Sequence, residues 1–142
     1  MLTVDFSQTN YTAKVLSPAP PKNFPTLAYD GAKFVFLIGG LRDKSVHRYN
    51  LLKNVWSSDL PNLPYFRGKT PSSACYINAC LFVYGDTVPL HNEIEKLDTS
   101  KTSSLKWETI VVDSTVLPIR NAPAMCALNR NEFVIIGGIH QS

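Results

Sequence analysis

The sequence predicts an all-β fold made of repeated strand units, and three observations support this prediction. An apolar strand runs into a glycine corner three times, at Phe34–Gly40, Leu81–Asp86 and Phe133–Gly138. The corner glycines lie 45 and 53 residues apart, and one β-propeller blade has roughly 40 to 50 residues. No segment keeps the 3.6-residue apolar period of a helix, and the ten prolines are scattered at strand borders.

The remainder of each unit keeps one order of residues. After the first corner come Tyr49-Asn50, Trp56, Leu63-Pro64 and Arg67, and after the second come Leu97-Asp98, Trp107, Leu117-Pro118 and Arg120. The start of the chain repeats the second half of this order with Val4-Asp5, Tyr11, Pro20 and Lys22. A basic residue precedes each corner by 17 residues: Lys22 precedes Gly39, Arg67 precedes Tyr84, and Arg120 precedes Gly137.

These residues resemble the kelch repeat, whose pattern is an apolar strand ending in Gly-Gly, then Tyr-Asp, Trp, Leu-Pro and Arg. The resemblance extends from about Leu2 to Ile139. The departures are Tyr84-Gly85 for Gly-Gly, Leu97 for Tyr, Asn50 for Asp, and Tyr11 for Trp. The resemblance implies propeller blades of four antiparallel strands, a to d, in which the glycine corner closes strand b.

The position of the glycine corners within this four-strand pattern assigns all of residues 1–142 to a propeller segment. We expect, in order, strands c and d of a first blade (1–24), a complete blade (25–66), a second complete blade (67–119), and strands a and b of a last blade (120–142). Asp30-Gly31 and Asn129–Asn131 predict hairpin turns, because Gly and Asn tolerate positive φ. Trp56 and Trp107 predict large apolar wedges between blades, each with an indole N–H that needs a partner.

The predicted strands amount to about three blades, whereas propellers typically close with four to eight. An open arc would expose apolar faces and strand edges, which favour association. Two explanations stay open. The chain is part of a longer propeller, or it is half of a six-bladed ring that a second copy completes.

Composition places the chain among globular proteins and excludes some partners. Apolar residues make up 44% and charged residues 18%, with a net charge of +3. The basic residues are spread singly apart from Arg42-Asp43-Lys44 and Arg67-Gly68-Lys69, so we expect no nucleic-acid partner. No apolar run approaches 18 residues and no leader opens the chain, so we expect neither a membrane partner nor secretion. We therefore expect a cytoplasmic location.

The cysteines and histidines, which could carry chemistry, are placed as packing or loop residues rather than as a catalytic site. Cys75, Cys80 and Cys126 lie in strand-like segments without metal-ligand spacing, which predicts reduced thiols. His47, His91 and His140 follow the three corners, but no nucleophile or carboxylate recurs beside them. We expect no enzyme activity, no metal and no cofactor. Some kelch-like propellers are enzymes, including copper oxidases with a Tyr, His and Cys centre, so an enzyme whose site lies outside these residues remains an alternative.

The function that remains is binding, because propeller loops present side chains on a rigid scaffold. Kelch-like proteins commonly use the loops between strands b and c and between strands d and a. The predicted partner-binding residues in these loops are Arg42, Asp43, Lys44, Arg67, Lys69, Asp86, His91, Asn92 and Arg120. Arg67 and Arg120 belong to the repeat itself, so a structural bond to a backbone carbonyl is the favoured alternative for both.

The sequence thus predicts a non-catalytic module that binds a protein partner or serves as a scaffold. The resemblance also implies a ubiquitin-ligase substrate adaptor, whose second domain would lie outside these residues, or a cytoskeletal component. No residue selects between these roles or identifies the partner.

Overall fold

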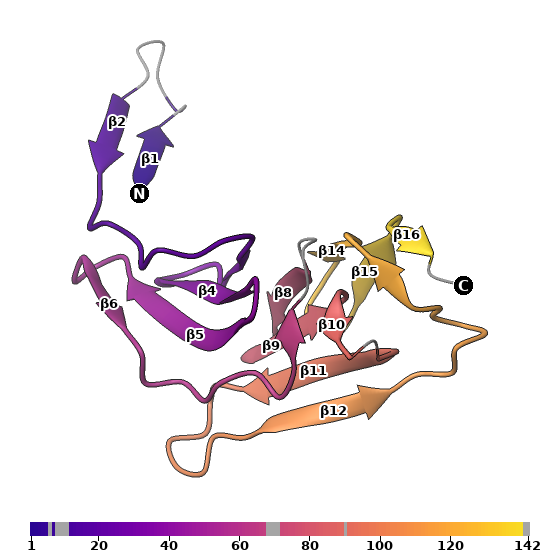
Figure 1. The fold of residues 1–142 in the computed structure, drawn as a ribbon. Helices are drawn as coiled ribbons and strands as arrows, with labels where there is room; N and C mark the ends of the chain where they lie inside the picture. Colours follow the sequence, from indigo (N-terminus) through magenta and orange to yellow (C-terminus); the bar gives the residue numbers. More distant parts are fainter. Residues whose placement is uncertain (6, 8–11, 68–71, 90, 141–142) are drawn as a thin grey trace.

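The computed structural model describes residues 1–5, 7, 12–67, 72–89 and 91–140. Within these ranges every regular element is a β-strand, and the all-β prediction is confirmed (Figure 1). The described residues contain no helix long and apolar enough to cross a membrane.

Sheet 1 contains four antiparallel strands in chain order: β3 (Thr26–Tyr29), β4 (Phe34–Gly40), β5 (Asp43–Asn50) and β6 (Val55–Ser57). The Asp30-Gly31 turn connects its first two strands, as predicted. The Asp30 carboxylate accepts hydrogen bonds from the backbone amides of Ala32, Lys33 and Phe34 at 2.8, 2.8 and 2.9 Å. Gly31 has a φ of 80°, which a glycine adopts without steric cost.

Sheet 2 has the same arrangement, with β8 (Ser73–Ile77), β9 (Cys80–Tyr84), β11 (Glu93–Asp98) and β12 (Trp107–Val111) in chain order. Asn78 and Ala79 form the two-residue turn between β8 and β9, with φ values of 48° and 60°. Two consecutive positive φ values are typical of a type I′ hairpin. This turn has no glycine, which is why the sequence did not signal it.

Two-stranded sheets lie at either end of the described chain (Figure 1). β1 (Leu2–Asp5) pairs with β2 (Thr12–Val15), and β14 (Ala124–Ala127) pairs with β15 (Phe133–Ile136). The predicted Asn129–Asn131 turn connects β14 to β15, where the Asn131 amide donates to Asn129 Oδ1 at 2.8 Å.

Two further pairs of very short strands were not predicted. β7 (Phe66–Arg67) pairs with β10 (Thr87–Val88), and β13 (Arg120–Asn121) pairs with β16 (Ile139–His140). Each pair joins the segment that enters a sheet to the residues just after that sheet's glycine corner. The linkers are therefore tied to the corners by backbone hydrogen bonds.

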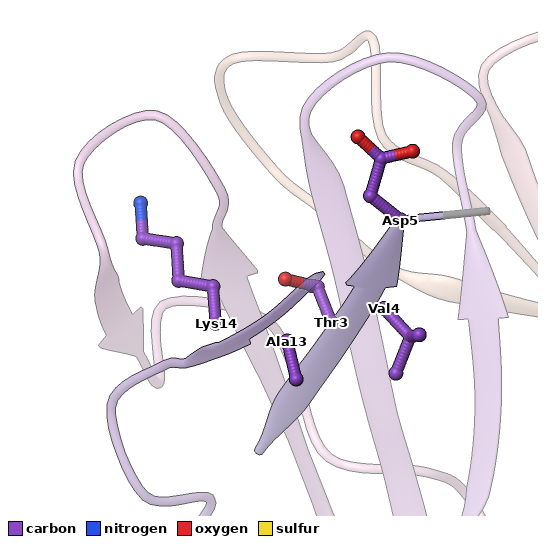
Figure 2. A pocket seen from close by; sticks show the side chains of 5 residues that line it. All are labelled: Thr3, Val4, Asp5, Ala13 and Lys14. Carbon is purple, nitrogen blue, oxygen red and sulfur yellow. The ribbon is translucent and has the colours of Figure 1, made fainter. Parts of the chain in front are cut away.

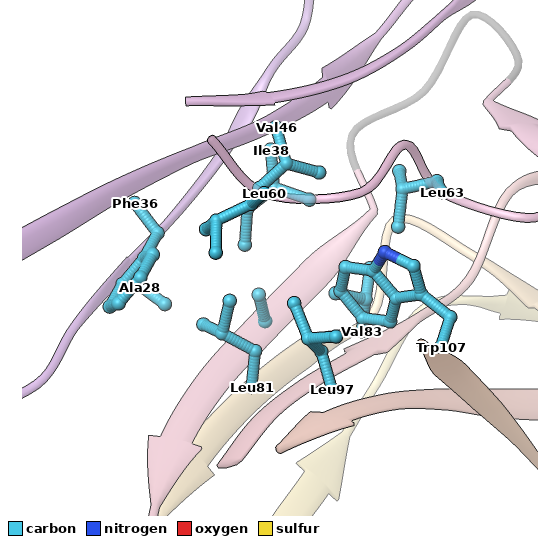
Figure 3. Close-up of a cluster of buried hydrophobic side chains, with 11 residues drawn as sticks. Ala28, Phe36, Ile38, Val46, Leu60, Leu63, Leu81, Val83, Leu97 and Trp107 are labelled. Atoms are coloured by element: carbon cyan, nitrogen blue, oxygen red, sulfur yellow. The ribbon is translucent and has the colours of Figure 1, made fainter. Parts of the chain in front are cut away.

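The hydrophobic core lies between sheets 1 and 2 (Figure 3). Phe36, Ile38 and Val46 of sheet 1 and Leu81 and Leu97 of sheet 2 are each at most 1% exposed. The remaining members of this buried cluster are Ala28, Leu60, Leu63, Ala74, Val83 and Trp107. Both sheets contribute side chains to one core, so neither sheet buries this apolar face alone.

Aromatic contacts continue this packing from sheet to sheet. Phe36 of sheet 1 stacks on Tyr76 of sheet 2 with ring centroids 5.4 Å apart, and Phe82 of sheet 2 meets Phe133 of β15 at 5.0 Å. The first strands of the three successive sheets lie side by side in the order β3, β8, β14, because β8 contacts both of the others. Sheet 2 is therefore covered on both faces.

The two tryptophans occupy equivalent places but differ in burial. Trp107 is 7% exposed, and its indole Nε1 donates to the Pro61 carbonyl oxygen at 2.9 Å. Trp56 is half-buried, packs on Tyr49 at a ring distance of 5.0 Å, and donates to the Ser17 carbonyl oxygen at 3.5 Å. Trp107 thus fills the space between sheets 1 and 2, as predicted, and Trp56 is only partly covered.

Candidate functional site

The glycine corners and linkers of sheets 1 and 2 meet on one part of the molecule, which we call the corner face. It consists of Leu41–Lys44 after β4, Tyr65–Arg67 before β8, and Asp86–Asn92 after β9, without residue 90. Leu41 forms a parallel bridge with Arg67, and the Arg42 amide donates to the Arg67 carbonyl oxygen at 3.2 Å. The β7–β10 pair then connects the linker to the second corner.

Close backbone approach explains the glycine at the first corner. Gly40 has a φ of 140°, and a Cβ atom at this position would lie 2.7 Å from the Asn23 carbonyl oxygen. Real Cβ atoms essentially never come this close to a backbone oxygen. The corner can therefore turn beside its linker only with glycine at this position.

Arg67 is an internal residue of the corner face rather than an exposed one. Its guanidinium donates to the Gly85 carbonyl oxygen at 3.0 Å and to Glu95 Oε2 at 2.6 Å, and the side chain is 1% exposed. The bond to the Gly85 carbonyl oxygen is of the kind that the structural alternative describes, and the burial leaves the side chain little surface for a partner. The basic residue of the repeat therefore holds the following corner in place.

Arg120 and Lys22, the other two basic residues of the repeat, also bond to the unit that follows them. Arg120 donates to the carbonyl oxygens of Gly137 and Gly138 at 3.1 and 3.3 Å. The Lys22 ammonium, 1% exposed, lies 2.6 Å from Asp43 Oδ2 and 2.7 Å from Ser45 Oγ. All three contacts join a linker to the unit that follows it. Arg67 and Arg120 bond to carbonyl oxygens of the corner, and Lys22 bonds to Asp43 and Ser45 just after the corner.

Glu95 is a buried carboxylate that the sequence analysis did not select. It is 0% exposed, and burial raises its pKa while the nearby Arg67 guanidinium opposes that increase. A sequence signal existed, because alternation in β11 places Glu95 on the same face as the core residue Leu97. A carboxylate on a core face needs a partner, and Arg67 is that partner.

Asp43 belongs to a polar network below the first corner. Burial raises the Asp43 pKa, but bonds from Lys22 and from Ser45 outweigh burial and lower it overall. Ser45 Oγ lies 3.3 Å from His47 Nε2, and His47 Nδ1 lies 2.8 Å from Ser58 Oγ. Burial, followed by the positive charge of Lys22, lowers the pKa of His47. The network orients His47 within the sheet, and the lowered pKa favours its neutral form.

Of the predicted residues after the second corner, Asp86 is buried, and His91 and Asn92 are half-buried. Asp86 is 7% exposed, the Asn92 side-chain amide donates to the Val112 carbonyl oxygen at 2.9 Å, and the His91 amide donates to Thr87 Oγ1 at 2.7 Å. Lys69 lies outside the described residues. Burial therefore withdraws Asp86 from a partner, and the half-buried His91 and Asn92 stay partly accessible.

The accessible part of the corner face is cationic and aromatic. Arg42 is exposed, and the Lys44 ammonium lies 4.9 Å from the centroid of the Phe66 ring, which is itself 45% exposed. Beside them, the Tyr65 and His91 rings lie 4.3 Å apart, and the Glu93 carboxylate raises the Tyr65 pKa. Tyr65 and Phe66 were not predicted, although two adjacent aromatics in a linker are a usable signal.

The described residues contain neither a metal-binding cluster nor a disulfide. No group of three His, Cys, Asp or Glu side chains is placed to hold a metal ion there. Cys75, Cys80 and Cys126 are free, and burial raises the pKa of the Cys75 thiol to about 11. A thiol with this pKa stays protonated and unreactive at neutral pH.

Two surface hollows lie away from the corner face. One of about 400 Å³ lies on the first hairpin and is lined by Thr3, Val4, Asp5, Ala13 and Lys14 (Figure 2). The other, of about 210 Å³, lies between sheet 2 and the β14–β15 turn, where Lys96 and Arg130 line it. Neither contains a residue that the sequence predicted for partner binding.

Comparison with protein families and with curated proteins gives no match to this chain. The likeness to the kelch repeat rests on the residues of the repeat alone.

Proposed function

We propose that the chain is a kelch-type β-propeller segment that acts as a non-catalytic protein-interaction module. The contact surface is the exposed part of the corner face, formed by Arg42, Lys44, Tyr65 and Phe66. The exposed Phe66 ring beneath the Lys44 ammonium, next to the exposed Arg42, is the observation that carries this proposal.

The propeller architecture is supported by the repeated packing of the sheets. Two four-stranded sheets follow in chain order, their first strands lie in series, and each tryptophan N–H meets the linker of the preceding unit. Such stacking places successive b-to-c corners at the same end of the sheets, where they form one surface.

The chemistry of the surface favours an acidic protein segment with an aromatic or aliphatic side chain. Arg42 can bind a carboxylate with two parallel hydrogen bonds. Phe66 and Tyr65 supply rigid apolar area, and aromatic residues together with Arg are enriched among the residues that dominate binding energy. The buried Arg67–Glu95 pair and the linker bonds fix the backbone beneath them, so little ordering is needed on binding.

The test compares proteins retained from a cell extract by the immobilised chain and by three variants. Arg42→Glu/Lys44→Glu and Phe66→Ala alter the surface, and Lys53→Glu changes an exposed charge in the β5–β6 turn as a control. We expect at least one protein to be retained by the original chain and by the control but lost with both surface variants. Identical retention by all four chains, with equal thermal melts, would remove this surface from the function.

The enzyme, adaptor and cytoskeletal alternatives all require residues or partners beyond those described. No geometry of the described residues favours any one of them over a simple interaction module.

A further inference from the structure

Buried polar atoms without a hydrogen-bond partner gather where the linker before β8 crosses the start of β11. Within the described residues these atoms are Arg67 Nε, His91 Nε2, Glu93 Oε2 and Glu95 Oε1. The remaining atoms of this kind in the described chain belong to Arg48, Asn92 and Asn121. Folded proteins pair almost all of their buried polar groups, so four unpaired atoms in one place need an explanation.

Two residues of the linker lie against two residues of β11. Glu93 and Glu95 alternate along the strand, so both point to the same face of sheet 2. Arg67 donates to Glu95 Oε2 at 2.6 Å. The negative charge of Glu93 is the largest cause of the raised Tyr65 pKa, and that of Glu95 adds to it. Tyr65 therefore lies near Glu93, beside the Arg67–Glu95 pair.

The Arg67–Glu95 pair forms a buried floor that keeps unused hydrogen-bonding capacity. Both side chains are at most 1% exposed. Arginine and a carboxylate can form two parallel hydrogen bonds, but here one bond joins Arg67 to Glu95 Oε2, and Glu95 Oε1 stays unpaired. The floor therefore has a carboxylate oxygen for a further donor.

The charges of this cluster leave an excess of one negative charge. The Arg67 guanidinium balances Glu95, whereas Glu93 forms no ion pair with any described residue. Glu93 is half-buried, so water screens its charge less than that of an exposed carboxylate. Two carboxylate oxygens without partners, Glu93 Oε2 and Glu95 Oε1, favour a ligand that is a cation with several N–H donors.

An aromatic wall stands beside these carboxylates. The Tyr65 and His91 rings lie 4.3 Å apart between centroids, and both residues are half-buried. A guanidinium group stacks on aromatic rings and presents a planar fork of five N–H donors, whereas an ammonium group is a compact point charge. The combination of ring, carboxylates and unpaired oxygens therefore favours arginine over lysine.

We propose that this cluster, formed by Tyr65, His91, Glu93 and Glu95, is an arginine subsite that receives an arginine side chain of the protein partner. The guanidinium pairs with the Glu93 carboxylate, stacks on the Tyr65 ring and donates to Glu95 Oε1. Since Glu93 Oε2 is covered in the free chain, the half-buried Tyr65 ring turns aside as the arginine enters.

The arginine subsite rests on the proposed function, because it names a second feature of the same partner. Tyr65 directly precedes Phe66, whose exposed ring lies beside Lys44. The partner segment should therefore carry an acidic side chain for Arg42 and an arginine for Glu93. A segment with charges of one sign only would meet repulsion at one of the two places.

The test titrates the isotope-labelled chain with N-acetyl-arginine methylamide at constant ionic strength and follows its amide signals by nuclear magnetic resonance. We expect saturable shifts at Tyr65 and Glu93. Glu93→Gln keeps the shape of the side chain and removes its charge, so it should weaken binding about tenfold. Glu132→Gln, which removes the same charge from an exposed site in the β14–β15 turn, is the matched control and should bind like the original chain.

A second probe tests the chemical class of the ligand. N-acetyl-lysine methylamide has the same charge and should bind several-fold more weakly than the arginine probe. Tyr65→Leu should remove most of this preference, because it removes the ring on which the guanidinium stacks. No saturable shift, equal binding by the original chain and by Glu93→Gln, or equal affinity for both probes would overturn the proposal.

These outcomes are separate from those of the partner-binding test, because Glu93→Gln leaves Arg42, Lys44 and Phe66 unchanged. In the retention experiment, Glu93→Gln should retain less of the selectively bound protein than Glu132→Gln does, with equal thermal melts. Selective retention without binding of the arginine probe would overturn only the arginine subsite. Binding of the probe without selective retention would overturn only the proposed partner surface.

Discussion

The indole Nε1 of Trp107 donates a 2.9 Å hydrogen bond to the carbonyl oxygen of Pro61, and this bond joins sheet 2 to the linker that leaves sheet 1. The ring itself lies in the core shared by the two sheets. A single side chain therefore combines apolar burial with a polar link between consecutive repeat units.

Trp107→Ala should lower the free energy of unfolding by about 3 to 5 kcal/mol, because it removes a large buried aromatic and leaves a cavity. Trp56→Ala is the matched comparison and should cost less, since Trp56 is only half-buried. Urea denaturation of both variants measures the difference. A loss under about 1 kcal/mol for Trp107→Ala would contradict the packing of sheet 2 on sheet 1.

Breaking the Arg67–Glu95 pair from one side should destabilise the fold by about 3 to 5 kcal/mol, because the remaining charge stays buried without its partner. Glu95→Leu and Arg67→Met are the single variants. The double variant should recover much of the loss, since an apolar pair leaves no buried charge. Additive losses in denaturation experiments would show that the two residues do not act as a pair.

His47 should make stability fall as the solution becomes acidic. Burial and the Lys22 charge lower its pKa below 6.5 in the folded chain, so protonation favours the unfolded state. The stability it contributes is present above pH 6.5 and is lost as pH falls through the lowered folded value. His47→Gln should flatten this part of the curve of unfolding free energy against pH. An unchanged slope in the variant would exclude His47 as the cause.

Ala79→Gly should stabilise the chain by about 0.5 to 1 kcal/mol, although it shortens a side chain. Ala79 has a φ of 60°, a conformation that costs residues with a Cβ roughly 1 to 2 kcal/mol and glycine very little. The greater freedom of glycine in the unfolded chain offsets part of this gain. Thermal melts give the sign directly, and a lower melting temperature for Ala79→Gly would contradict the turn conformation.

The strand pattern was predictable from sequence because it depends on local features. The apolar run Phe34–Ile38 and the turn at Asp30-Gly31 specify a strand and a hairpin without reference to the rest of the chain. The Asn78-Ala79 turn was missed, because alanine carries no signal for positive φ. The short β7–β10 and β13–β16 pairs depend on linkers that approach corners from a distance in sequence.

The sequence predicted which loops form the corner face, but it predicted less well which of their residues are accessible. Loop position identified Arg42 and Lys44, which are wholly or partly accessible, but it could not show that Arg67 is buried. The burial of Arg67 depends on Glu95, which lies 28 residues further along the chain and belongs to another strand. Phe66 was missed because its exposure is a property of the linker's path, which the sequence does not specify.

The measurement that tests the stacked-sheet architecture most directly is the pattern of nuclear Overhauser contacts between aromatic rings in solution. The account predicts contacts between Phe36 and Tyr76, across sheets 1 and 2, and between Phe82 and Phe133, across sheet 2 and β15. Observation of both would establish that three consecutive units stack in the order that a propeller requires. Absence of either contact in the folded chain would contradict this architecture and, with it, the proposed corner face.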